Sequence, residues 1–206
     1  MIGFLKIKMY ISIIISITME DIKIYDKHVA FWGSFLSNFY PCTFILNEPF
    51  DVIYEINDVD ESERKDFIWK SSEQCFMAHK AHCFMDFKTL GEIISTEDPK
   101  EAKKLGRKVK DYNDEIWSSI RKTIMKKVVF EKFSQNEELK SLLLSEEFKG
   151  KTFVEGSPFD KVWGVGMDWR NPDIDNEENW KGENLLGKVL TEIRDKFLEE
   201  NEQKIN

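Results

Sequence analysis

Two acidic residues, Glu73 and Asp160, are the side chains of this sequence best suited to chemistry, together with Lys80, Arg107 and several Trp residues. Cleavage of a glycosidic bond passes through an oxocarbenium-like state that a carboxylate stabilises, while an acid or base handles the leaving group or the water. Aromatic rings can stack on a flat base, and Lys or Arg can hold a phosphate. The composition therefore permits glycosidic-bond cleavage, although residue types alone do not single it out.

A predicted helix positions Glu73. Ser71 and Gln74 fit the S-x-x-Q capping box, so we expect a helix to begin here and to continue to about Ala81. One side of that helix carries Glu73, Phe76, Met77 and Lys80. Because a buried charge is costly unless it is paired or used, this mixed side predicts the wall of a pocket. In the alternative interpretation, Glu73 only favours the positive end of the helix dipole and Lys80 extends its ammonium into solvent.

The overall composition predicts one folded domain. A chain of 206 residues with 13% aromatic residues can bury a substantial core without disulfides. The net charge of -8 argues against a general nucleic-acid binder, although it leaves room for a local basic cleft. Three Cys at no framework spacing predict reduced thiols and a cytoplasmic location.

Several familiar sites are absent from the sequence: a P-loop, a G-x-S-x-G elbow, a G-x-G-x-x-G fingerprint and an H-E-x-x-H motif. Cys75, His79 and Cys83 share one face of the predicted helix. The outer two are about 12 Å apart along the helix axis, too far for both to ligate one ion. We therefore expect neither a metal site nor a cofactor.

The N-terminal extension, residues 1–21, contains an apolar run from Met9 to Ile17 after two lysines. The run is too short to span a bilayer as a helix and is followed by no small-x-small cleavage site. A strand or an unstructured extension fits it better, and translation can begin at Met1 or at Met19. We expect the domain itself at residues 22–200, a C-terminal tail at 201–206, and no membrane association.

Patterning along the rest of the chain predicts short strands followed by helices. The expected strands are residues 22–31, 43–46, 52–56, 67–69 and 152–155. The expected helices after the first are 99–105, 114–133, 136–144 and a last helix that begins within 182–187 and continues past 197. Residues 57–66 and 168–181 are polar loops. The aromatic segment 31–41 is broken by Gly, Ser, Asn and Pro, so it is a loop that either lines a pocket or folds into the core.

The order of several short motifs is more specific than any one of them. They are Phe31-Trp32 with Leu36-Ser37-Asn38-Phe39, Ser72-Glu73-Gln74-Cys75-Phe76 with Ala78-His79-Lys80, Leu105-Gly106-Arg107, Trp117, Asp160-Lys161-Val162-Trp163-Gly164 and Gly182-Glu183-Asn184-Leu185-Leu186-Gly187. Together this series resembles the YbiA-like, or NADAR, family over roughly residues 28–198. The resemblance implies an α+β fold, a single α-rich domain with a few short antiparallel strands.

The resemblance also implies N-glycosidase activity. Family members hydrolyse early riboflavin-pathway intermediates and release ribose 5-phosphate from a ribosylaminopyrimidine, which makes a small phosphoribosyl molecule the expected partner. Some members instead remove ADP-ribose from modified guanine in nucleic acid. A third alternative is a module that binds ADP-ribose or NAD without turnover, although two retained acids count against it. The loops at 57–66 and 168–181 look longer than a minimal family domain needs, so the substrate stays open, as does the oligomeric state.

Carried over residue by residue, the resemblance makes Glu73 and Asp160 catalytic. Glu73 matches the glutamate of the S-E-x-x-F-x-A-x-K pattern, and Asp160 the acid of the D-x-x-W-G pattern. The implied substrate-binding positions are Trp32, Asn38, Lys80, Arg107, Trp117, Trp163, Gly164 and Asn184. In our hypothesis ionised Glu73 activates water or stabilises the oxocarbenium, Asp160 orients the ribose or acts as second acid or base, and Trp117 or Trp163 stacks on the base.

Overall fold

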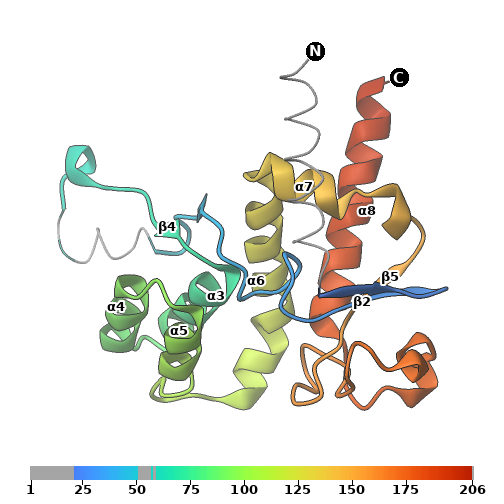
Figure 1. The fold of residues 1–206 in the computed structure, drawn as a ribbon. Helices are drawn as coiled ribbons and strands as arrows, with labels where there is room; N and C mark the ends of the chain where they lie inside the picture. Colours follow the sequence, from blue (N-terminus) through green and yellow to red (C-terminus); the bar gives the residue numbers. More distant parts are fainter. Residues whose placement is uncertain (1–20, 51–56, 58, 206) are drawn as a thin grey trace, which may run out of the picture. The chain divides into compact units, whose positions relative to one another are not determined.

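The computed structural model describes residues 21–50, 57 and 59–205. Most of the predicted extension and the expected strand at 52–56 lie outside these residues. The described chain combines helices with two small sheets, so the predicted α+β class is confirmed (Figure 1). Its contacts form two compact units, which we describe separately: residues up to Ser37 together with Glu138 onwards, and Asn38–Glu137.

Helix α3, Ser72–Cys83, is the centre of the Asn38–Glu137 unit. Helices α4 (Phe87–Ser95), α5 (Pro99–Gly106) and α6 (Asp114–Ser134) all contact it (Figure 1). Strands β3 (Phe44–Ile45) and β4 (Ile68–Trp69) pair antiparallel, and β4 leads directly into α3. Most residues of α3 are buried, the polar ones included, because three helices surround it.

The predicted start of α3 is confirmed, but only half of its capping box forms. The Ser71 hydroxyl accepts a hydrogen bond from the Gln74 N–H at 3.1 Å. The Gln74 side chain accepts from the Lys70 N–H at 2.9 Å instead of returning to Ser71. Its amide nitrogen donates to the carbonyls of Ile93 and Thr96, so Gln74 ties the start of α3 to the end of α4.

Helix α4 was not among the predicted elements. Asp86 caps it by accepting from the Thr89 N–H at 3.1 Å, and Leu90 and Ile93 bury one side. An Asp followed by apolar residues three positions apart was a usable signal. The predicted helices at 99–105, 114–133 and 136–144 are confirmed as α5, α6 and α7 (Glu137–Leu143), and residues 61–63 of the acidic loop form one exposed 3-10 turn, η1.

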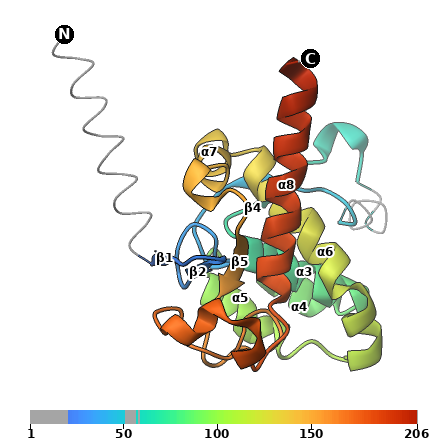
Figure 2. The ribbon, with the colours of Figure 1, turned by 90° about the vertical axis from the view of Figure 1, so that its right-hand side faces the viewer.

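The second unit contains a three-stranded sheet in the order β1-β2-β5 (Figure 2). The single strand expected at 22–31 is wrong: it is two strands, β1 (Ile22–Ile24) and β2 (His28–Phe31), paired antiparallel around a turn at Tyr25. Strand β5 (Thr152–Glu155) pairs parallel with β2, which corrects the expectation of antiparallel strands only. A parallel partner requires a long crossover connection, and residues 32–151 supply it.

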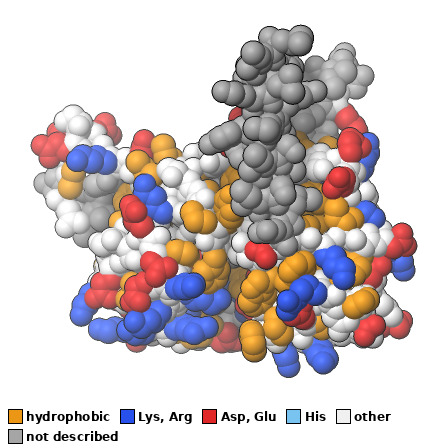
Figure 3. Space-filling model, in the orientation of Figure 1, with side chains coloured by type: hydrophobic (Ala, Val, Ile, Leu, Met, Phe, Trp, Pro, Cys, Tyr) orange, Lys and Arg blue, Asp and Glu red, His pale blue; other side chains and the backbone are white. Residues whose placement is uncertain are grey.

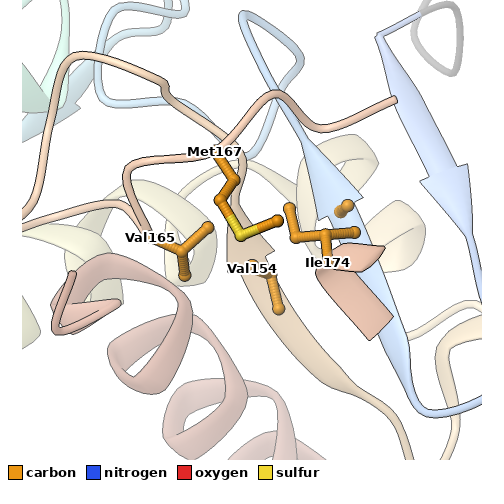
Figure 4. Packing of buried hydrophobic residues seen from close by; sticks show 5 residues of the cluster. Val154, Val165, Met167 and Ile174 are labelled. Atoms are coloured by element: carbon orange, nitrogen blue, oxygen red, sulfur yellow. The ribbon is translucent and has the colours of Figure 1, made fainter. Parts of the chain in front are cut away.

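Beside this sheet, helix α8 (Leu185–Ile205) contacts β5 and continues through residues 201–205, where a tail was expected (Figure 2). Residues 168–181 fold onto the sheet with two 3-10 turns, η3 (Pro172–Asp175) and η4 (Glu177–Asn179). The apolar core there consists of Ala30, Val154, Val165, Met167 and Ile174 (Figure 4). In the described part of the chain, no helix is long and apolar enough to cross a membrane.

Candidate active site

Glu73 lies in the first turn of α3 and is only 4% exposed. Its backbone N–H donates to the Asn38 carbonyl at 2.9 Å, so this hydrogen bond joins Asn38 of the loop to the first turn of the helix. The positive end of the helix dipole favours an ionised carboxylate at this position. Its burial distinguishes Glu73 from the exposed acids that only complement a helix dipole, and its place in the wall of a pocket stays a prediction.

Two residues next to the Glu73 backbone carry buried, unpartnered polar atoms. The side-chain oxygens of Asn38 and Ser72 are buried and have no hydrogen-bond partner among the described residues. Ser72 precedes Glu73 in the chain, and Asn38 bonds its backbone. A buried polar atom left unpaired costs about 1–3 kcal/mol, so such atoms indicate a place for a polar ligand. Sequence reasoning missed Ser72 as a site residue, although it stands beside Glu73 in the motif.

Lys80 lies seven residues after Glu73 on α3, about 10 Å further along the helix axis. Its ammonium donates to the Gly106 carbonyl at 2.9 Å and lies 4.1 Å from the centre of the Tyr112 ring. Partial burial lowers the pKa of Lys80, the charge of Asp114 opposes that shift, and the Arg107 guanidinium adds to it. Lys80 is therefore held in place by α5 and the following turn, which disagrees with a lysine that only reaches for solvent.

Trp117 packs into the helical core. It is 5% exposed, and its ring centre lies 5.0 Å from that of Phe76. Arg107 follows α5 as its C-cap and is exposed. Most of the Trp117 surface already contacts protein, which leaves little of the ring for a substrate base. Stacking of Trp117 on such a base stays a prediction.

Asp160 belongs to the unit that contains the three-stranded sheet. Its Oδ1 accepts hydrogen bonds from the N–H groups of Val162 at 2.9 Å and Trp163 at 2.8 Å, and its own N–H donates to the Ser157 hydroxyl. The carboxylate therefore shapes the loop that precedes Gly164. A Cβ at Gly164 would lie 2.7 Å from the Glu155 carbonyl, so that position has a packing reason to be glycine.

Asn184 has an evident structural role. It is completely buried with a left-handed φ of 54°, which Asn tolerates better than most residues. Its amide accepts from the Glu155 N–H at 3.1 Å and donates to the Phe153 carbonyl at 2.9 Å. The side chain joins β5 to the start of α8, and contact with substrate stays a prediction.

The predicted site residues divide between the two units. Asn38, Glu73, Lys80, Arg107 and Trp117 belong to one, and Trp32, Asp160, Trp163, Gly164 and Asn184 to the other. Cooperation between Glu73 and Asp160 therefore stays a prediction. In the loop at 31–41, Phe35 is fully buried in the core and Trp32 is 39% exposed, so pocket lining by Trp32 stays a prediction.

The helical unit also contains an open hollow of about 700 Å³ between α4 and α5. It is lined by Lys88, Gly91, Glu92, Ser95, Thr96, Glu101 and Leu105. None of the predicted site residues lines it, so it gives no support to a catalytic role. Within the described ranges, no three His, Cys, Asp or Glu side chains are placed to hold a metal ion.

Residues 27–198 match the NADAR domain family. Protein irg-1 of Caenorhabditis elegans is 36% identical over 174 residues, which cover 82% of this chain and 78% of that protein. N-glycosidase R617 of Acanthamoeba polyphaga mimivirus is 42% identical over 133 residues, which are 65% of this chain and 75% of that one. Riboflavin biosynthesis protein VVA0006 of Vibrio vulnificus is 30% identical over 166 residues, 80% of this chain but 36% of its own length.

The fold is also similar to a solved structure. The NMR structure of the Escherichia coli protein YbiA aligns with a TM-score of 0.62 and 25% identity, covering 89% of this chain and 92% of that one. A similar α+β fold therefore occurs in a family member.

Proposed function

Because the chain belongs to the NADAR domain family, we propose that it hydrolyses the N-glycosidic bond of a ribosylaminopyrimidine phosphate from early riboflavin biosynthesis. The family and the N-glycosidase class predicted from the sequence are confirmed by relatives named N-glycosidases. The observation that carries the proposal is the burial of Glu73 at the start of α3, where Ser72 and Asn38, the residues next to its backbone, have buried side-chain oxygens without a hydrogen-bond partner among the described residues. The Vibrio vulnificus relative, named for riboflavin biosynthesis, supports this choice of substrate.

In the proposed reaction the bond between ribose C1′ and the amino nitrogen breaks, and the electron pair leaves with the nitrogen. The Glu73 carboxylate stabilises the oxocarbenium and takes a proton from the attacking water, whose oxygen bonds to C1′. The leaving nitrogen gains one proton, which Asp160, as the proposed second acid, takes up from solvent and passes on, while Glu73 returns its proton to solvent. The products are the free aminopyrimidine and ribose 5-phosphate.

The cations of the helical unit suit the phosphate of this substrate. Lys80 and Glu73 are about 10 Å apart along α3, so their side chains can contact opposite ends of a phosphoribosyl group. Lys80 uses one N–H on the Gly106 carbonyl and has further donors for phosphate oxygens. Arg107 is close enough to influence the charge of Lys80 and is exposed, so it can contact the same phosphate.

A second candidate, removal of ADP-ribose from guanine in nucleic acid, is favoured by a basic side of α5. Lysines and arginines gather over α4 and α5 in Figure 3, with acidic side chains among them. At spacings of three and four along α5 and its C-cap turn, one face carries Lys100, Lys103, Lys104, Arg107 and Lys108. Such a face can contact a phosphate backbone, although the net charge of -8 counts against it.

The deciding experiment compares wild type with Glu73→Gln on two substrates. Release of ribose 5-phosphate from the ribosylaminopyrimidine phosphate is measured beside release of ADP-ribose from ADP-ribosylated guanosine and DNA. We expect turnover of the first substrate and a loss of about 10²- to 10⁴-fold in kcat in the variant. Glu115→Gln is the matched control, since Glu115 is an exposed acid in the first turn of α6, and its activity should be unchanged.

Each other outcome has a distinct meaning. A folded Glu73→Gln variant with full activity would show that Glu73 is not catalytic. Turnover of only the ADP-ribosylated substrates would support the second candidate. Tight ADP-ribose binding without turnover, unchanged by Glu73→Gln, would identify a binding module.

Asp160 requires a separate substitution, because its Oδ1 also organises a loop. Asp160→Asn keeps a side-chain oxygen for the N–H groups of Val162 and Trp163 while removing the carboxylate. We expect a lower kcat with an unchanged unfolding midpoint if Asp160 transfers the proton. Normal activity would reduce its role to loop structure.

Cys42, Cys75 and Cys83 carry free thiols in the structure. A cytoplasmic location remains part of the proposal.

A further inference from the structure

The ammonium of Lys80 is held from two directions. It donates to the Gly106 carbonyl at 2.9 Å, and the face of the Tyr112 ring lies 4.1 Å away. A lysine ammonium has three donors and a flexible four-carbon stem, so an unsupported one samples many positions. Contacts on two sides restrict that freedom and leave donor capacity for an anionic oxygen.

Tyr112 is itself fixed from three sides. Its face carries Lys80, its ring meets Phe84 edge-on with centres 5.4 Å apart, and its hydroxyl donates to Asp114 Oδ1 at 2.5 Å. The residue before it, Asp111, has a left-handed φ of 51°, so the turn holds a backbone conformation that a residue other than glycine seldom adopts.

The exposure of Tyr112 separates it from a core residue. It is 42% exposed although three contacts fix it, whereas Trp117 and Phe76 in the same unit are 5% and 1% exposed. A large aromatic ring fixed at the surface beside a lysine can orient that lysine and remain within reach of a ligand. None of the sequence motifs included Tyr112.

We propose that Tyr112 is a positioning residue that holds the Lys80 ammonium for the substrate phosphate, and that it thereby sets a preference for phosphorylated N-ribosyl substrates. This inference rests on the proposed function. Asp114 helps to hold Tyr112 by accepting a hydrogen bond from its hydroxyl, while the face of the Tyr112 ring makes the direct contact with Lys80. The ring should therefore matter more than the hydroxyl.

The test compares Tyr112→Leu, which removes the ring, with Tyr112→Phe, which keeps it. For each variant kcat and KM are measured on the ribosylaminopyrimidine phosphate and on the same compound without phosphate. We expect Tyr112→Leu to raise KM for the phosphorylated substrate about 5- to 30-fold, the range of a partly desolvated cation–π contact. The kcat of Tyr112→Leu and its KM for the unphosphorylated compound should stay within twofold of wild type. Tyr112→Phe should have the same low KM for the phosphorylated substrate as wild type.

Phe87→Leu is a matched control, because Phe87 is a similarly exposed aromatic residue of the same unit, at 45%, whose ring lies 6.3 Å from that of His82. It should leave both KM values unchanged. The inference is overturned if Tyr112→Leu leaves KM for the phosphorylated substrate unchanged, raises both KM values equally, or behaves like Tyr112→Phe.

A binding measurement separates this inference from the proposed function. Calorimetric titration with ribose 5-phosphate needs no turnover, so it is informative even if wild type hydrolyses neither substrate and the proposed function fails. A 5- to 30-fold weaker affinity in Tyr112→Leu alone supports positioning of Lys80. Equal affinities in all variants, or no binding to wild type, contradict it.

Discussion

His79 should make the folded protein sensitive to acid. It lies on α3, is 5% exposed, and packs its ring 4.7 Å from that of Phe50. Burial lowers the pKa of His79 from 6.5 to about 4, even though the hydrogen bond to the Cys75 carbonyl at 2.9 Å favours the charged form. The unfolded chain therefore binds a proton near pH 6.5, where the folded protein does not.

The sign and size follow from that difference. Between pH 6.5 and 4 the unfolded state holds more protons, so the free energy of unfolding falls as the pH is lowered. At pH 5 the loss is about 2 kcal/mol, from 1.5 pH units at about 1.36 kcal/mol each. The stabilisation is fully present above pH 6.5 and is lost progressively toward pH 4.

The assay is urea unfolding of wild type and His79→Gln at pH 7 and at pH 5. Carboxylates also respond to acid, so each protein is described by the change in its free energy of unfolding from pH 7 to pH 5. That change is then compared between wild type and the variant. We expect that change to be about 2 kcal/mol smaller in His79→Gln. His82→Gln is the control, because His82 is only partly buried and its pKa is lowered less far from its ordinary value. Equal pH dependence in wild type and His79→Gln, or an NMR titration of His79 near pH 6.5, would refute the reasoning.

Two further substitutions test the packing around the candidate site. Gly106→Ala would place a Cβ 2.1 Å from the Met77 sulfur and should destabilise the protein by about 1–3 kcal/mol, whereas Gly91→Ala meets nothing within 4 Å and should stabilise α4 by about 0.5–1 kcal/mol. Equal urea midpoints for the two variants would contradict that contrast. Asn184→Ala should cost about 3 kcal/mol, since it leaves two backbone groups of β5 unpaired and puts Ala at a φ of 54°. A loss below 1 kcal/mol in thermal unfolding would show that its amide bonds contribute little.

Local sequence signals located most helices. Ser71 capped α3 as predicted, Pro99 opened α5, and the apolar spacing of 114–133 gave α6 almost to the residue. These signals depend on hydrogen bonds and side-chain spacings within about four positions, so the interacting residues are close together in the sequence and can be recognised from it. Helix α4 was missed because its buried apolar residues, Leu90 and Ile93, occupy only two positions of a short segment.

Strand pairing was less accessible from the sequence. The alternation across 22–31 gave strand character but hid the turn at Tyr25, and nothing local indicated that β5 would pair parallel with β2. The β2–β5 pairing joins residues more than 100 positions apart, and which edges meet depends on the packing of the whole unit.

By itself, the sequence determined the family through the order of its motifs, and it placed Glu73 in the first turn of a helix. Only the tertiary structure decided that Glu73 is buried, that the side-chain oxygens of Asn38 and Ser72 are buried without a partner among the described residues, and that the Tyr112 ring contacts Lys80. It also decided that the Gln74 amide donates a hydrogen bond to the end of α4 and the Asn184 amide donates one to β5. The reason is physical: a capping residue finds its partner within one turn, whereas burial and side-chain partners depend on segments that only folding brings into contact.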